Sequence, residues 1–104
     1  MDKAVSNYIE FELSNYDKRC RAIEESETKN TAYYKKAESA VYAINKVLTM
    51  LGERYKELFH YQYREGLPNG KVIIAMDISE RTYYRMKRRL INQVGRYTGL
   101  YNGW

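Results

Sequence analysis

Cysteine, histidine and proline each occur once in this chain of 104 residues, as Cys20, His60 and Pro68. A single cysteine excludes an internal disulfide and a cysteine-rich zinc site. We expect Cys20 to be a small buried apolar side chain and His60 to lie on a helix flank, since a catalytic pair would need a third group to orient it. The chain also lacks a glycine-rich phosphate loop, a nucleophile elbow and the spacing of metal ligands. The sequence therefore predicts a protein that is not an enzyme and that uses no metal or other cofactor.

Long apolar runs are also missing, and the longest extends only from Val72 to Met76. This run is far too short to span a bilayer. The first residues lack the basic start and apolar stretch of a secretory signal. We therefore expect a cytoplasmic protein with no membrane partner.

Acidic side chains are almost absent from one end of the chain. Residues 1–50 carry eight basic and eight acidic side chains, residues 51–79 carry four of each, and residues 80–104 carry six basic ones and a single acid, Glu80. The whole net charge of +5 therefore lies in the last segment. Five cations fall within nine residues of that segment: Arg81, Arg85, Lys87, Arg88 and Arg89. Such a block is typical of a protein that binds a polyanion, either a nucleic acid or an acidic membrane surface.

Apolar residues recur every three or four positions in two stretches of the N-terminal half, which predicts helices. The first stripe follows a candidate N-cap, Asp2, and consists of Val5, Ile9, Leu13, Tyr16, Cys20 and Ile23. The second, with a spacing of about 3.5 residues that suits lengthwise helix packing, consists of Tyr34, Ala37, Val41, Ile44, Leu48 and Leu51. We interpret residues 1–50 as a helical hairpin that packs within the chain or also pairs two subunits as a homodimer. The composition agrees with an all-α fold, since β-branched residues are sparse.

The C-terminal half shows a different pattern of shorter helices. A third helix is expected to begin near Glu53, directly after Gly52. Residues 64–70 hold two glycines and the proline, and such a cluster ends a helix. The apolar residues 71–76 are expected to form a short helix, because no second strand is available to pair with them.

A turn and a last helix complete the pattern. Asp77 can adopt the left-handed conformation that tight turns demand, and Ser79 is a credible N-cap for a helix over residues 80–96. The residues expected to face inward are Tyr83, Met86, Leu90, Val94 and Tyr97. Those expected on the opposite side are Arg81, Tyr84, Arg85 and Arg88. Because the apolar face is needed for the core, insertion into a membrane surface is the weaker interpretation. Residues 51–98 are thus expected to form a helix-turn-helix unit, and residues 99–104 a tail.

Leu51 to Val94 also carries a recognisable motif. It combines an "R…L…YxEGL" helix with an "IS-x-x-T" turn, through Arg54, Leu58, Tyr63, Glu65, Gly66, Leu67, Ile78, Ser79 and Thr82. This combination resembles region 4 of the bacterial sigma-70 family, which holds a helix-turn-helix. The version "SERTYYRMKRRLI" is similar to small phage-encoded late transcription regulators of the ArpU and RinA type. The resemblance implies a double-stranded DNA-binding transcription regulator of phage or prophage late genes, working in a bacterial host cell.

In a helix-turn-helix protein the last helix lies in the major groove with its N-terminal residues nearest the bases. Arg81 and Arg85 are one turn apart, so each could make a bidentate contact with guanine. We expect base contacts from Glu80, Arg81 and Arg85, and contacts with the DNA backbone from Lys71, Ser79, Thr82, Tyr84, Arg88 and Arg89. Two alternatives stay open. One is a DNA-packaging component resembling a small terminase subunit, and the other is a sigma-like adaptor that contacts RNA polymerase.

Overall fold

The computed structural model of the chain describes residues 2–25 and 32–99, and these residues form an all-α compact domain. The predicted fold class is confirmed at this level, and no strand occurs in the described ranges. No helix among them is long and apolar enough to cross a membrane. The elements are α1 (Lys3–Ser14), α2 (Tyr16–Glu25), α3 (Ala32–Leu51), α4 (Glu53–Phe59), the π-helical turn η1 (His60–Arg64), α5 (Asn69–Met76) and α6 (Glu80–Tyr97).

The first predicted stripe is divided between two helices. Asp2 caps α1 as expected, since its side chain accepts a hydrogen bond from the Ala4 amide at 2.8 Å. The helix ends at Asn15, whose side-chain amide donates to the Phe11 carbonyl at 2.7 Å. Asparagine competes with the helix for backbone partners in this way. The interpretation of Val5 to Ile23 as one continuous stripe is therefore wrong, because the chain changes direction at Asn15.

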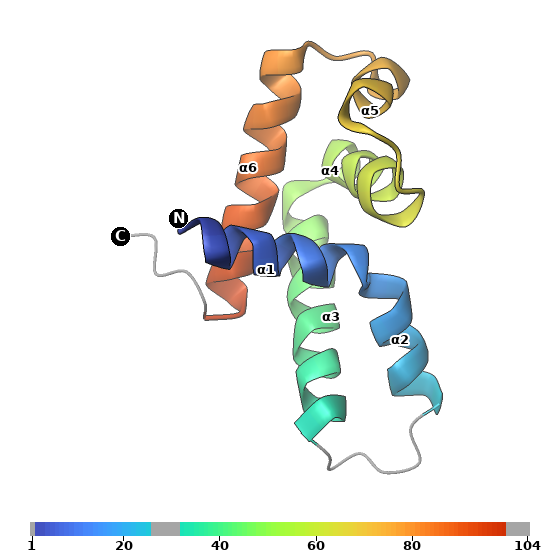
Figure 1. The fold of residues 1–104 in the computed structure, drawn as a ribbon, viewed down its shortest axis with the longest axis vertical. Helices are drawn as coiled ribbons and strands as arrows, with labels where there is room; N and C mark the ends of the chain where they lie inside the picture. The colour runs from blue at the N-terminus through green and yellow to red at the C-terminus, as the bar shows by residue number, and fades with distance from the viewer. Residues whose placement is uncertain (1, 26–31, 100–104) are drawn as a thin grey trace.

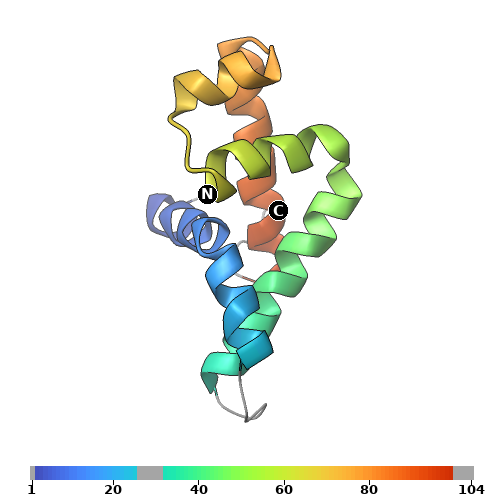
Figure 2. The same ribbon diagram turned by 90° about the vertical axis from the view of Figure 1, so that its right-hand side faces the viewer.

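In the view of Figure 1, α4, α5 and the start of α6 form the upper part of the molecule, and α2 with the start of α3 forms the lower part (Figures 1 and 2). Helices α2 and α3 pack side by side in antiparallel directions and extend to the end of the molecule opposite α5, whereas α1 lies across α6. A buried ion pair joins α1 to α2: the Arg19 guanidinium donates to both carboxylate oxygens of Glu12, at 2.8 and 3.2 Å. Glu12 is only 2% exposed, so the pair is shielded from water and fixes the angle between the two helices.

One hydrophobic cluster connects the two halves of the chain. Its buried members are Ile9, Leu13, Ile44, Val47, Leu48, Leu58, Phe59, Tyr63, Val72, Met76, Tyr83, Met86, Leu90, Ile91 and Val94. The second predicted stripe is used within this chain, since Tyr34, Ala37, Ile44 and Leu48 are buried. These four side chains therefore pack within the chain, as one of the two interpretations of the hairpin predicts. Cys20 is half-buried, not fully buried as expected.

The turn between α5 and α6 has the predicted local geometry. Asp77 adopts the left-handed conformation, with φ 53° and ψ 53°. The Ile78 amide donates back to the Ile73 carbonyl, which closes the end of α5. Arg54 adds a cap that the sequence did not predict, because its guanidinium donates to the Met76 carbonyl at 2.8 Å. Helix α5 begins at Asn69, two residues before the expected start.

The prediction for Tyr97 is wrong. The residue was expected to face inward, but 44% of its surface is exposed. Its spacing matches the buried stripe, yet its hydroxyl lies at the surface, 3.9 Å from the sulfur of the exposed Met50 of α3. Ile91, which the predicted stripe omitted, is buried where α6 faces α1.

Candidate nucleic-acid interface

Helix α6 has one face in the core and one in solvent. Tyr83, Met86, Leu90 and Val94 are buried, which confirms four of the five predicted inward positions. On the other side, Arg81, Tyr84, Arg85 and Arg88 together line a shallow hollow of about 370 Å³. The prediction that these four side chains share one outward face is confirmed. We call this group the outward row.

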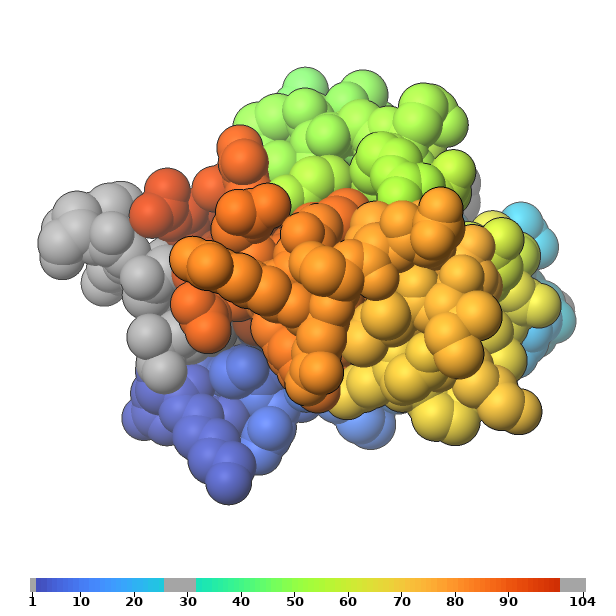
Figure 3. All heavy atoms as spheres, turned by 90° about the horizontal axis from the view of Figure 1, so that it is seen from above, coloured from blue at the N-terminus to red at the C-terminus, as the bar shows by residue number. Residues whose placement is uncertain are grey.

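The start of α6, the helix that carries the outward row, forms one end of the molecule together with α5 (Figures 1 and 3). Tyr84 is held in place because its ring packs edge-to-face on the buried Tyr83 ring, with centroids 4.9 Å apart. Three guanidinium groups stand beside it on one helix face, and the described residues provide no ion pair for Arg81, Arg85 or Arg88. This arrangement can bind an extended anion.

The start of α6 is closed by its own side chains. Ser79 Oγ accepts from the Thr82 amide at 3.1 Å and donates to Thr82 Oγ1 at 3.0 Å. One hydroxyl proton of this pair is therefore used inside the turn, and the other stays available for a ligand. The two hydroxyls that were predicted to contact phosphate thus hold each other at the start of α6. Glu80 is exposed in the first turn, where the helix dipole favours a carboxylate.

The remaining predicted contacts lie outside the hollow. Lys71 is exposed on α5, and Arg89 is exposed on the flank of α6 next to the outward row. Neither side chain lines the hollow that the outward row forms. The structure thus brings four of the nine predicted residues around one hollow, and the other five do not line it.

Lys87 differs from the other four cations of the basic block. Its ammonium group lies 3.1 Å from Glu10 Oε1 on α1, and only 18% of its side chain is exposed. The Tyr63 hydroxyl donates to the same oxygen at 3.0 Å. Burial, and then the Glu10 carboxylate, raise the pKa of Tyr63 well above its usual value. Sequence reasoning missed this ion pair, because Glu10 comes from the opposite end of the chain.

A second polar group holds α6 against α5 and η1. The Tyr83 hydroxyl donates to Asn69 Oδ1 at 2.7 Å and also contacts the side-chain oxygen of Gln62. The Gln62 amide donates to Asn69 Oδ1 at 3.2 Å. Burial raises the pKa of Tyr83 to about 12, with smaller contributions from Tyr84 and Glu10. The sequence predicted Tyr83 as a core residue but did not reveal its partners.

Within residues 2–25 and 32–99, no three histidine, cysteine, aspartate or glutamate side chains are grouped so that they could hold a metal ion. Comparison of the chain with protein-family models, with curated proteins and with solved structures finds no match. The geometry of the outward row therefore carries the functional argument.

Proposed function

We propose that this protein is a sequence-specific double-stranded DNA-binding regulator of transcription, in which α6 enters the major groove. In this proposal α5, the turn and α6 form a helix-turn-helix similar to that of sigma-70 region 4. The likeness of residues 51–94 to phage late transcription regulators suggests phage or prophage genes as targets, in the cytoplasm of a bacterial host.

The observation that carries the proposal is the outward row. A helix-turn-helix protein presents the N-terminal half of its second helix to the bases. Arg81 and Arg85 occupy that half and point away from the core, so each can reach the O6 and N7 acceptors of a guanine. Thr82, Tyr84 and Arg88 flank them and are suited to phosphate contacts.

The first test is selection of bound sequences from random duplex DNA at two salt concentrations. We expect the wild-type chain to enrich a motif that persists at the higher salt. The variant Arg81→Ala/Arg85→Ala should lose the motif and keep weak, salt-sensitive binding, because phosphate contacts do not depend on sequence. A matched control, Arg21→Ala/Lys35→Ala, removes two exposed cations from α2 and α3 and should enrich the wild-type motif.

The outcome also separates the alternatives. A double variant that still selects the wild-type motif would place the base-reading face elsewhere. Salt-sensitive binding by the wild-type chain without any enriched motif would favour a DNA-packaging component. Absence of DNA binding, together with co-sedimentation with purified RNA polymerase, would favour an adaptor. The symmetry of an enriched motif would report whether a homodimer binds it.

A further inference from the structure

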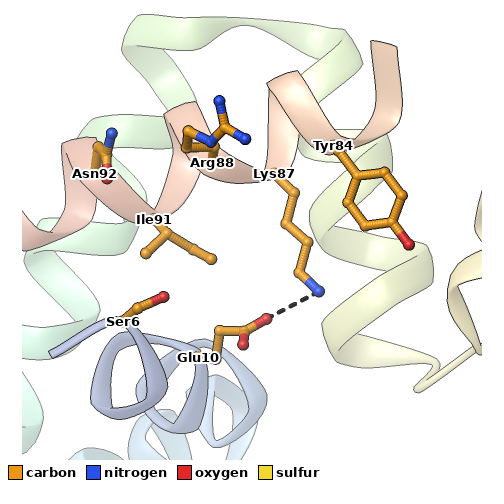
Figure 4. A pocket seen from close by; sticks show the side chains of 7 residues that line it. All are labelled: Ser6, Glu10, Tyr84, Lys87, Arg88, Ile91 and Asn92. Atoms are coloured by element: carbon orange, nitrogen blue, oxygen red, sulfur yellow. Dashed lines mark ion pairs between the residues drawn. The ribbon is translucent and has the colours of Figure 1, made fainter. Parts of the chain in front are cut away.

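A second cavity lies beside the outward row, between α1 and α6. It has a volume of about 430 Å³ and is lined by Ser6 and Glu10 of α1 and by Tyr84, Lys87, Arg88 and Asn92 of α6. Figure 4 shows the ion pair between Lys87 and Glu10 spanning the space between the two helices. Ile91 contributes the apolar part of the lining.

The charges around this cavity leave an excess of one cation. Lys87 and Glu10 neutralise each other at 3.1 Å, and Glu10 Oε1 is further occupied by the Tyr63 hydroxyl. The described residues provide no ion pair for Arg88. The Ser6 hydroxyl and the Asn92 amide add hydrogen-bond donors. The cavity therefore suits a group with a single negative charge and several acceptor oxygens, which describes a phosphodiester.

The cavity adjoins the outward row, because Tyr84 and Arg88 line both hollows. Along α6 the distance from Arg81 to Asn92 is roughly 16 Å at 1.5 Å per residue. The major groove is only about 12 Å wide. When α6 enters the groove by its N-terminal end, with Arg81 nearest the bases, the segment near Asn92 therefore lies beyond the width of the groove, beside the sugar-phosphate backbone.

We propose that the cavity between α1 and α6 receives a backbone phosphate of the bound duplex. Arg88 supplies the charge, while Ser6 and Asn92 donate hydrogen bonds. This inference rests on the proposed function, and it gives α1 a direct part in DNA binding that the sequence did not predict. α1 is then a second anchor on the DNA, and the ion pair between Lys87 and Glu10 holds it in position.

The test compares the same change of a side-chain amide to a carboxylate at two neighbouring positions. Asn92→Asp places a carboxylate in the cavity, whereas Gln93→Glu adds the same charge at a half-buried position that does not line it. Binding to a random-sequence duplex is measured over a range of salt concentrations. We expect Asn92→Asp to bind about tenfold more weakly than Gln93→Glu, as loss of one charge-assisted hydrogen bond implies. Its slope of log K against log salt should also be smaller by roughly 0.9.

Two further pairs of variants protect the test against a folding defect. Asn92→Lys should bind more tightly than Gln93→Lys, because the added ammonium group would lie beside the phosphate. Ser6→Ala should bind more weakly than Ser14→Ala, which changes an exposed serine at the far end of α1. Equal affinities and equal salt slopes within the pairs would overturn the inference.

Failure of this inference can be told apart from failure of the proposed function. Suppose that the wild-type chain binds duplex DNA and that Arg81→Ala/Arg85→Ala loses the selected motif. Equal affinities and salt slopes for the Asn92 and Gln93 variants then refute the phosphate site in the cavity but not the proposed function. A wild-type chain that does not bind duplex DNA refutes both.

Discussion

Residues of the same type have different surroundings on α6. Arg81, Arg85 and Arg88 extend into solvent on one face, whereas Lys87, inside the same basic block, is paired with Glu10. Tyr83 and Tyr84 are adjacent, yet Tyr83 is buried and Tyr84 is 42% exposed. The helical turn of about 100° per residue separates neighbours onto different faces. Composition alone therefore overstates both the number of cations free for a ligand and the number of aromatic rings available for stacking.

Tyr83 also gives a prediction about stability at high pH. Its pKa is raised to about 12 in the folded chain, so between pH 10 and 12 the unfolded chain loses the phenolic proton while the folded chain keeps it. The contribution of Tyr83 to the free energy of unfolding is therefore fully present below pH 10 and is lost as the pH rises through 12. Tyr83→Phe should show a shallower fall in melting temperature over this range than the wild type, with Tyr42→Phe, an exposed tyrosine, as the control. Parallel curves for wild type and Tyr83→Phe would contradict this account.

At the scale of elements, the turn between α5 and α6 determines the direction of the proposed recognition helix. Three features of the turn set this direction: the left-handed backbone at Asp77, the Ser79 cap, and the hydrogen bond from the Arg54 guanidinium of α4 to the last carbonyl of α5. The hydrogen bonds of Tyr83 then connect α6 to Asn69 at the start of α5 and to Gln62. The two helices are thus fixed relative to each other at both ends of α5.

The left-handed backbone at Asp77 gives the second prediction. Residues with a side chain pay a conformational penalty there that glycine avoids, so Asp77→Gly should raise the free energy of unfolding by about 0.5–1 kcal/mol. Asp77→Val should lower it by roughly 1–2 kcal/mol, since β-branched side chains fit this conformation poorly. Urea unfolding followed by circular dichroism measures both. Asp77→Asn, which tolerates the same backbone, should stay close to the wild type.

On the scale of the whole molecule, the net positive charge belongs to the segment that contains α6. Residues 1–79 are balanced, and the excess of five positive charges belongs to residues 80–104. The tertiary structure places α1, with its own polar groups, beside that excess (Figures 1 and 3). The DNA-binding surface that we propose therefore combines the two ends of the sequence.

This distribution predicts how strongly salt weakens binding. Neutralisation of four or five phosphates gives a slope of log K against log salt near −4, at roughly 0.9 for each contact. Arg88→Ala/Arg89→Ala should reduce the magnitude of that slope by about two. Arg21→Ala/Lys35→Ala removes the same charge from α2 and α3 and should leave the slope near the wild-type value. A similar reduction in both variants would show that total charge, and not the outward face of α6, controls binding.

The sequence by itself determined those features that depend on neighbouring residues. Periodicity predicted the all-α fold and the two faces of α6, and the local chemistry of Asp77 and Ser79 predicted the turn. Such features are set within one or two helical turns, so a short stretch of sequence contains the forces that produce them.

Only the tertiary structure decided the features that join distant segments. It divided the first stripe at Asn15, paired Lys87 with Glu10, exposed Tyr97 and formed the cavity between α1 and α6. The break at Asn15 involves a local side-chain hydrogen bond that the apolar spacing does not reveal. The ion pair and the cavity have no local signal, because each depends on where a helix from one end of the chain crosses a helix from the other. Burial and ion pairing follow from that crossing, and the crossing is set by the packing of the whole core.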